Sequence, residues 1–115
     1  KKEIVEINKK IYEHSDSAID ALYKKGSEES VRGFNEIYKK FGIDFDMYFY
    51  ESDAAKVGEE LVKNNIGKVF EESEGATVFK GSHTRVFINS QGLPTYEAKD
   101  LGNAKNKYEL VIKMI

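Results

Sequence analysis

Apolar side chains in the first part of the chain recur every three or four positions, which is the spacing of an amphipathic helix. The repeat runs over residues 3 to about 25, from Ile4 to Tyr23. The cluster Ser15–Ser17 predicts a break into two helices, because short polar side chains compete for backbone hydrogen bonds and favour helix N-caps.

A further amphipathic segment follows. Ser27, which comes after Gly26, is expected to cap a helix whose apolar face runs from Val31 to Phe41. Gly42 stands where the end of a helix favours a left-handed residue. The N-terminal part of the chain is therefore predicted to be a helical hairpin.

The periodicity then changes to the two-residue alternation of a strand. Over residues 45–50, the apolar side chains of Phe45, Met47 and Phe49 alternate with Asp46, Tyr48 and Tyr50. This alternation predicts a half-buried strand. Ser52 or Asp53 is expected to cap a short helix after it, and the turn-forming run Asn64–Gly67 is expected to end that helix.

Three short apolar runs come next, separated by turn-forming residues. They are predicted to be strands of a small antiparallel sheet, over residues 68–71, 76–80 and 84–89. Thr95 should then cap a helix reaching about Lys105, with Pro94 just outside it, and residues 108–115 are predicted to be a final buried strand. This order of elements predicts an α+β fold whose last helix and strand resemble half of a βαβ unit.

The composition narrows the classes of function. The 115 residues suffice for one domain or part of one, and a net charge of −2 does not predict independent binding to nucleic acid. The chain has no cysteine, and His14 and His83 lack the spacing of metal ligands, so no metal site is expected. No apolar run is long enough to cross a membrane, and we expect a cytoplasmic protein without membrane contact.

Both ends of the chain suggest a segment of a longer protein. Residue 1 is a lysine, and the apolar run Leu110–Ile115 stops without a cap or a polar tail. A strand cut off in this way would lose its neighbours in a parallel sheet. We therefore expect this run to self-associate with another copy of the chain, to pack non-natively or to be disordered.

Three short motifs follow one another along the chain. They are Phe41–Tyr48 followed by Glu51-Ser52, then Glu72–Ala76, and finally Arg85–Asp100. In the last one, a strand and a glycine turn lead through Pro-Thr-Tyr into a helix with an acid four residues after the tyrosine. Over residues 27–115 the order and spacing resemble those of arginyl-tRNA synthetases, a class I family of aminoacyl-tRNA synthetases.

The resemblance implies a parent ligase that uses ATP and Mg²⁺ to form arginyl-adenylate and then transfers L-arginine to its tRNA. It implies that residues 1–90 are an insertion within the catalytic domain. Residues 91–115 would be a truncated part of the Rossmann-like catalytic fold, the whole forming one compact unit. Tyr96 and Asp100 match the family's tyrosine and acid that bind the substrate arginine, and no residue of the chain is assigned a catalytic role.

The chemistry of Tyr96 and Asp100 agrees with such a role. Residues four apart project from one face of a helix, and Asp100 has no cationic residue three or four positions away. A carboxylate accepts two parallel N–H bonds from a planar guanidinium, and a tyrosine adds a hydrogen bond or a cation–π contact. Taken alone, such a tyrosine is more often a core residue and such an aspartate merely solvated, and the resemblance is what favours substrate recognition.

Other matches are weaker. Glu51-Ser52 fits the family motif, but the serine is equally well explained as a helix cap, and Arg85 is expected to be a surface residue. Gln91 stands where the family commonly has an acid, and it is expected to serve turn geometry. Lys99 replaces an arginine often found before the acid, and lysine is a poor substitute in a bidentate contact.

The nucleotide-binding signatures of class I synthetases do not occur in this sequence. It has neither a His-Ile-Gly-His-type nor a Lys-Met-Ser-Lys-Ser-type segment, and adenylate formation needs positive charge at the developing pyrophosphate. By itself the chain is predicted to be inactive, without a cofactor and with weak arginine binding at most. Two other interpretations stay open: a non-catalytic α+β binding or interaction module, and an unrelated small structural domain.

Overall fold

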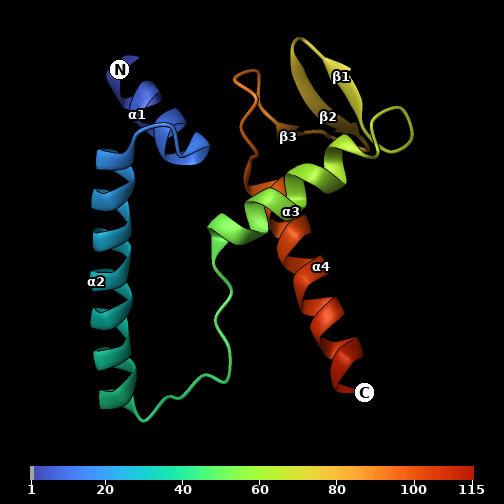
Figure 1. Ribbon diagram of the computed structural model, residues 1–115. Helices are drawn as coiled ribbons and strands as arrows, with labels where there is room; N and C mark the ends of the chain where they lie inside the picture. Colours follow the sequence, from blue (N-terminus) through green and yellow to red (C-terminus); the bar gives the residue numbers. More distant parts are fainter. Residues whose placement is uncertain (1) are drawn as a thin grey trace. The chain divides into compact units, whose positions relative to one another are not determined.

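The computed structural model describes residues 2–115, which form four helices and one three-stranded sheet (Figure 1). This content confirms the predicted α+β class. By their contacts the residues form two compact units, the first ending at Asp46 and the second spanning Met47–Ile115, whereas the sequence led us to expect one. Each unit is described by itself.

The first unit is a helical hairpin, as predicted. Helix α1 (Lys2–Glu13) contacts helix α2 (Ser17–Phe41), and in the turn between them His14 has a positive φ of 53°. Asp16 caps α2, and its side chain accepts hydrogen bonds from two amides of the first turn at 3.2 and 3.3 Å. The predicted break at Ser15–Ser17 is therefore confirmed.

The predicted helix boundary at Gly26 is wrong, because α2 continues through it to Phe41. A glycine inside a helix costs only about 1 kcal/mol relative to alanine, and helix-forming residues on both sides carry the helix across it. The predicted end of α2 is confirmed. Gly42 is left-handed, with φ 66° and ψ 30°, and its amide donates to the carbonyl of Lys39 at 3.1 Å.

The second unit is built on two crossing helices, α3 (Glu51–Lys63) and α4 (Tyr96–Met114), with the sheet beside them (Figure 1). Helix α3 confirms the predicted short helix, although its N-cap position is Tyr50, without a side-chain bond, and not Ser52 or Asp53. The core joins both helices to the sheet, through Val62, Phe70, Ile88 and Ala98.

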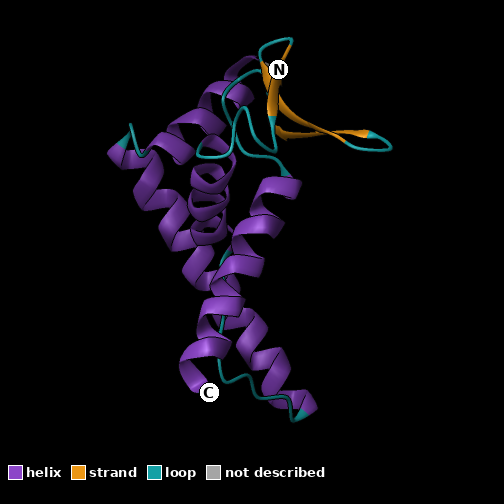
Figure 2. Cartoon of the chain, turned by 90° about the vertical axis from the view of Figure 1, so that its right-hand side faces the viewer, coloured by secondary structure: helices purple, strands orange, loops and turns teal. Residues whose placement is uncertain are grey.

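Strands β1 (Glu71–Ser73), β2 (Ala76–Lys80) and β3 (Thr84–Ile88) form the predicted antiparallel sheet in that order. Figure 2 shows the strands in orange. The turn between β1 and β2 is Glu74-Gly75, as expected, with φ of 51° and 77°. Strand β1 begins later than predicted, because the three amides before it donate to the Asn65 carbonyl in a turn.

Residues 43–50 do not form the predicted strand and have no regular structure. A strand needs a neighbour that pairs with its backbone donors and acceptors. The sheet formed by the described residues contains only β1, β2 and β3. The alternating apolar side chains of this segment therefore stay 39% to 49% exposed.

Helix α4 continues to Met114, so the end predicted near Lys105 and the strand predicted over residues 108–115 are both wrong. Residues 103–114 contain neither glycine nor proline, and most of them favour helix. Glu109 supports the extension, since its carboxylate lies 3.7 Å from the Lys105 ammonium one turn earlier. Self-association through a C-terminal strand therefore loses its basis.

Candidate functional site

The start of α4 is fixed to the end of β3 by a hydrogen-bonded turn. Gln91 was expected to serve this turn, and its backbone N–H donates to the side-chain oxygen of Asn89 at 2.9 Å. The Thr95 amide donates to the Phe87 carbonyl at 2.9 Å, and the Thr95 hydroxyl donates to the Val86 carbonyl at 2.7 Å. Thr95 occupies the predicted N-cap position, but its hydroxyl holds the strand and makes no bond to the helix.

The crossing of α3 and α4 decides which face of α4 stays exposed. Ala98 and Gly102 are buried where α4 passes against Gly58 of α3. At 3.6 residues per turn, Asp100 points roughly 160° away from both of those residues, and Tyr96 points roughly 160° away from Ala98 and roughly 120° away from Gly102. The contact with α3 therefore turns the tyrosine and the aspartate outward.

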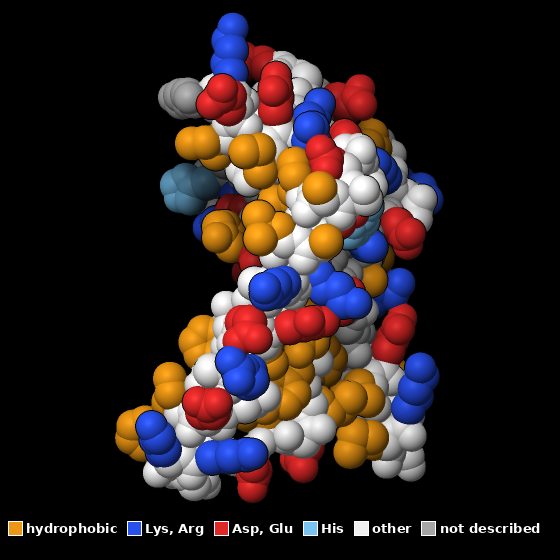
Figure 3. Space-filling view, turned by 60° about the vertical axis from the view of Figure 1, so that its left-hand side comes forward, with side chains coloured by type: hydrophobic (Ala, Val, Ile, Leu, Met, Phe, Trp, Pro, Cys, Tyr) orange, Lys and Arg blue, Asp and Glu red, His pale blue; other side chains and the backbone are white. Residues whose placement is uncertain are grey.

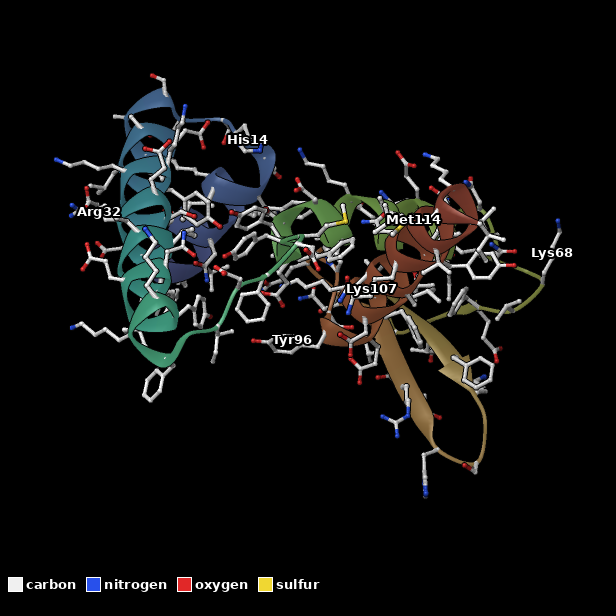
Figure 4. All side chains as sticks on the ribbon, turned by 90° about the horizontal axis from the view of Figure 1, so that it is seen from below. His14, Arg32, Lys68, Tyr96, Lys107 and Met114 are labelled. Carbon is white, nitrogen blue, oxygen red and sulfur yellow. The ribbon has the colours of Figure 1, made fainter. Side chains whose placement is uncertain are left out.

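Tyr96 and Asp100 lie one turn apart on this outward face. The tyrosine is 72% exposed and extends away from the helix (Figure 4), and the aspartate is exposed as well. Within residues 2–115 the Asp100 carboxylate makes no hydrogen bond or ion pair. Together they form an open surface with an unneutralised carboxylate beside a phenol, and a planar cation could bind there.

The charged neighbours of Asp100 are tied to other elements. The Lys99 ammonium lies 3.4 Å from a carboxylate oxygen of Glu51 on α3 and 5.1 Å from the centre of the Tyr96 ring. On the other flank, the Glu97 carboxylate lies 3.8 Å from the guanidinium of Arg85 on β3. These pairs are partly exposed, so each contributes at most about 1 kcal/mol.

Of the other residues singled out from the sequence, the fold brings two next to charged residues of α4 and leaves one exposed. Glu51 is brought next to Lys99 because it begins α3, and Arg85 is brought next to Glu97 by β3. Ser52 is exposed at the start of α3. Sequence analysis missed both ion pairs, because each joins two different elements whose side chains meet only in the fold.

The outward face of α4 continues toward its C-terminus. Asn103 and Lys107 follow Asp100 at helical spacing, and the Lys107 ammonium lies 5.7 Å from the centre of the Phe49 ring. The Asn103 side-chain oxygen is buried and has no hydrogen-bond partner among residues 2–115. The outward face of α4 is therefore polar along its length, whereas the face that packs on α3 consists of small apolar residues.

The rest of the surface has no concentration of one charge on the side shown in Figure 3, where basic and acidic side chains are interleaved. Among the described residues, no group of three or more histidines, aspartates and glutamates is placed to hold a metal ion. In the same part of the chain, no helix has the length and apolar character required to span a bilayer.

Curated proteins match the chain, although no protein-family model does. The arginine–tRNA ligase of Phocaeicola vulgatus is 31% identical over 85% of this chain and 17% of the ligase. The arginine–tRNA ligase of Flavobacterium psychrophilum is 31% identical over 81% of this chain and 16% of the ligase. That of Clavibacter sepedonicus is 35% identical over 92% of this chain and 22% of the ligase. The resemblance predicted from the motifs is confirmed, and the chain corresponds to a segment of such ligases.

Proposed function

We propose that the arginine–tRNA ligase to which this segment belongs attaches L-arginine to its tRNA through an arginyl-adenylate. ATP with Mg²⁺ would drive the reaction in that enzyme. The support is the identity of 31% to 35% with three arginine–tRNA ligases over most of this chain. The chain spans only 16% to 22% of their lengths, so the remaining machinery must come from outside it.

Within that enzyme, Tyr96 and Asp100 recognise the guanidinium group of the substrate. One observation carries this assignment: Asp100 is exposed and unpaired within the described residues, while its charged neighbours Glu97 and Lys99 both have partners. An exposed, unpaired carboxylate on an ordered helix can accept two parallel N–H bonds from a guanidinium. The Tyr96 hydroxyl, one turn earlier on the helix, would add a third bond.

The chain by itself holds part of an amino acid site and no ATP site. Its sequence has neither of the two class I nucleotide signatures, and we propose that it is inactive alone. Residues 91–115, which carry the tyrosine and the acid, would belong to the Rossmann-like catalytic domain. Residues up to 90 would be the insertion in that domain.

The test is the KM for arginine in a full-length arginine–tRNA ligase that carries this segment. Asp100→Asn keeps the shape of the side chain but removes its charge. It should raise the KM for arginine by about 10- to 100-fold, as expected for loss of hydrogen bonds to a charged group. The KM for ATP should not change.

Asp53→Asn is the matched control, because Asp53 is an exposed aspartate in the first turn of α3. It loses the same charge and should leave the KM for arginine unchanged. Equal effects of the two substitutions would show that Asp100 acts only through the net charge of the protein. In that case the assignment of the arginine site is wrong.

A further inference from the structure

Lys99, which precedes Asp100 in sequence, pairs with Glu51 and not with Asp100. The Lys99 ammonium lies 3.4 Å from Glu51 and 5.1 Å from the centre of the Tyr96 ring, and the Lys99 side chain is only 27% exposed. On α4, Lys99 lies between the outward face and the face packed on α3. Its long side chain is therefore drawn toward the start of α3.

We infer that Glu51 is a positioning residue that holds Lys99 against α3 and the Tyr96 ring, and so keeps the Asp100 carboxylate available to a cationic ligand. This inference rests on the proposed function, because it assigns Glu51 a task at the same site. Glu51 acts through Lys99 and does not itself contact the ligand.

Two carboxylates, those of Glu51 and Asp100, compete for the one ammonium group of Lys99. Lysine carries a compact charge on a flexible four-carbon stem, so Lys99 can move toward whichever acid attracts it. The crossing of α3 and α4 places Glu51 beside it, and a cation–π contact with Tyr96 favours the same position. Without Glu51, the acid that follows Lys99 directly in sequence, Asp100, has no partner among the described residues to keep the ammonium away.

An ammonium group close to Asp100 would weaken the binding of a guanidinium there, because the two cations repel and share one acceptor. Exposed ion pairs contribute only up to about 1 kcal/mol, so the expected loss of affinity is small, about 3-fold. The arrangement adjusts the affinity of the site and does not create it.

The first arm of the test uses the 115-residue chain without ligand. The ¹³C chemical shift of the Asp100 carboxyl carbon is measured in the native chain, in Glu51→Gln, and in Glu51→Gln with Lys99→Met. The single substitution should change the shift, because the released ammonium approaches Asp100, and the added Lys99→Met should restore it. An Asp100 shift that does not respond to Glu51→Gln overturns the inference.

Glu71→Gln is the control for this arm. It removes another exposed carboxylate from an ion pair, the one with Lys80 at 3.0 Å in the sheet. The Asp100 carboxyl shift should be native in this variant. A response as large as that of Glu51→Gln would mean that the shift follows net charge, and the inference would be wrong.

The second arm uses the full-length ligase. Glu51→Gln should raise the KM for arginine about 3-fold without changing kcat, and adding Lys99→Met should return it to the native value. A rise that persists with methionine at position 99 would show that Glu51 contacts the ligand directly, which overturns the inference. If the carboxyl shifts respond as expected but Asp100→Asn leaves the KM unchanged, the positioning of Lys99 stands and the proposed arginine site fails.

Discussion

Gly58 of α3 and Gly102 of α4 meet at the helix crossing so closely that neither position has room for a side chain. A Cβ atom at Gly58 would lie 1.8 Å from the carbonyl oxygen of Ala98, and one at Gly102 would lie 2.0 Å from that of Ala54. Both distances are far shorter than a van der Waals contact. The direct approach of the two backbones sets which face of α4 packs on α3, and it leaves the face with Tyr96 exposed.

Gly58→Ala and Gly102→Ala should each destabilise the second unit. The added methyl group would force the helices apart, and overpacking of this kind costs about 1–3 kcal/mol. The measurement is amide hydrogen exchange of α4, which should become faster in both variants.

Gly33→Ala in α2 is the control, because a Cβ there meets nothing within 4 Å. Alanine is favoured over glycine in a helix by about 0.5–1 kcal/mol, so amide exchange in α2 should become slower. Unchanged exchange in α4 for Gly102→Ala would contradict the close helix crossing.

This crossing could not be predicted from the sequence, although its signal is present. Ala54 and Gly58 are four residues apart, and so are Ala98 and Gly102. Small residues at this spacing have meaning only when two helices present them to each other. The pairing of α3 with α4 is a long-range contact that local patterns do not carry.

The helix break over Ser15–Ser17, where Asp16 caps α2, and the end of α2 at Gly42 were predicted correctly, because the side chain or backbone of one residue determines each. The two wrong strands have a different cause. Residues 45–50 alternate as a strand does, but no neighbour pairs with them among the described strands. Residues 108–114 are apolar enough for a buried strand, yet they continue an existing helix that no residue interrupts. The pair Tyr96 and Asp100 was placed correctly on one face because helical spacing is local.

Asn103→Leu should stabilise the second unit. The side-chain oxygen of Asn103 is buried without a partner among residues 2–115, and an unsatisfied polar group of this kind costs about 1–3 kcal/mol. Leucine has no polar atom to bury and favours helix, so the free energy of unfolding should rise by about 1 kcal/mol. Urea denaturation followed by circular dichroism measures it.

Asn103→Asp is the contrasting substitution at the same position. It places a charge where the amide oxygen already lacks a donor, so it should lower the free energy of unfolding. A leucine variant that is less stable than the native chain would show that the Asn103 amide is satisfied in solution.

The stability of the start of α2 should decrease at low pH. The Lys10 ammonium, which lies 3.1 Å from the Asp16 carboxylate, and the amides of Ile19 and Ala18 lower the pKa of Asp16. Because the folded pKa is below the unfolded value of about 3.9, the carboxylate stabilises the helix start fully above that value. This contribution is lost as the pH falls through the folded pKa.

Asp16→Asn should remove this acid response, because asparagine still caps a helix but carries no charge. The measurement is the pH dependence of the NMR shifts of residues 17–20, with Asp46→Asn as a control that should keep the response. An acid response of the same size in Asp16→Asn would contradict its assignment to the Asp16 carboxylate.

Tyr96 should act on arginine through its hydroxyl group more than through its ring. The Lys99 ammonium lies 5.1 Å from the ring centre, so a second cation over the same face would be repelled. In a full-length ligase carrying this segment, Tyr96→Phe should therefore raise the KM for arginine about 10-fold, the effect of losing one hydrogen bond to a charged group. Tyr96→Leu should raise it little further. Tyr108→Phe, at another exposed tyrosine of α4, should leave the KM unchanged. A native KM in Tyr96→Phe together with a raised KM in Tyr96→Leu would show that arginine binds the ring face.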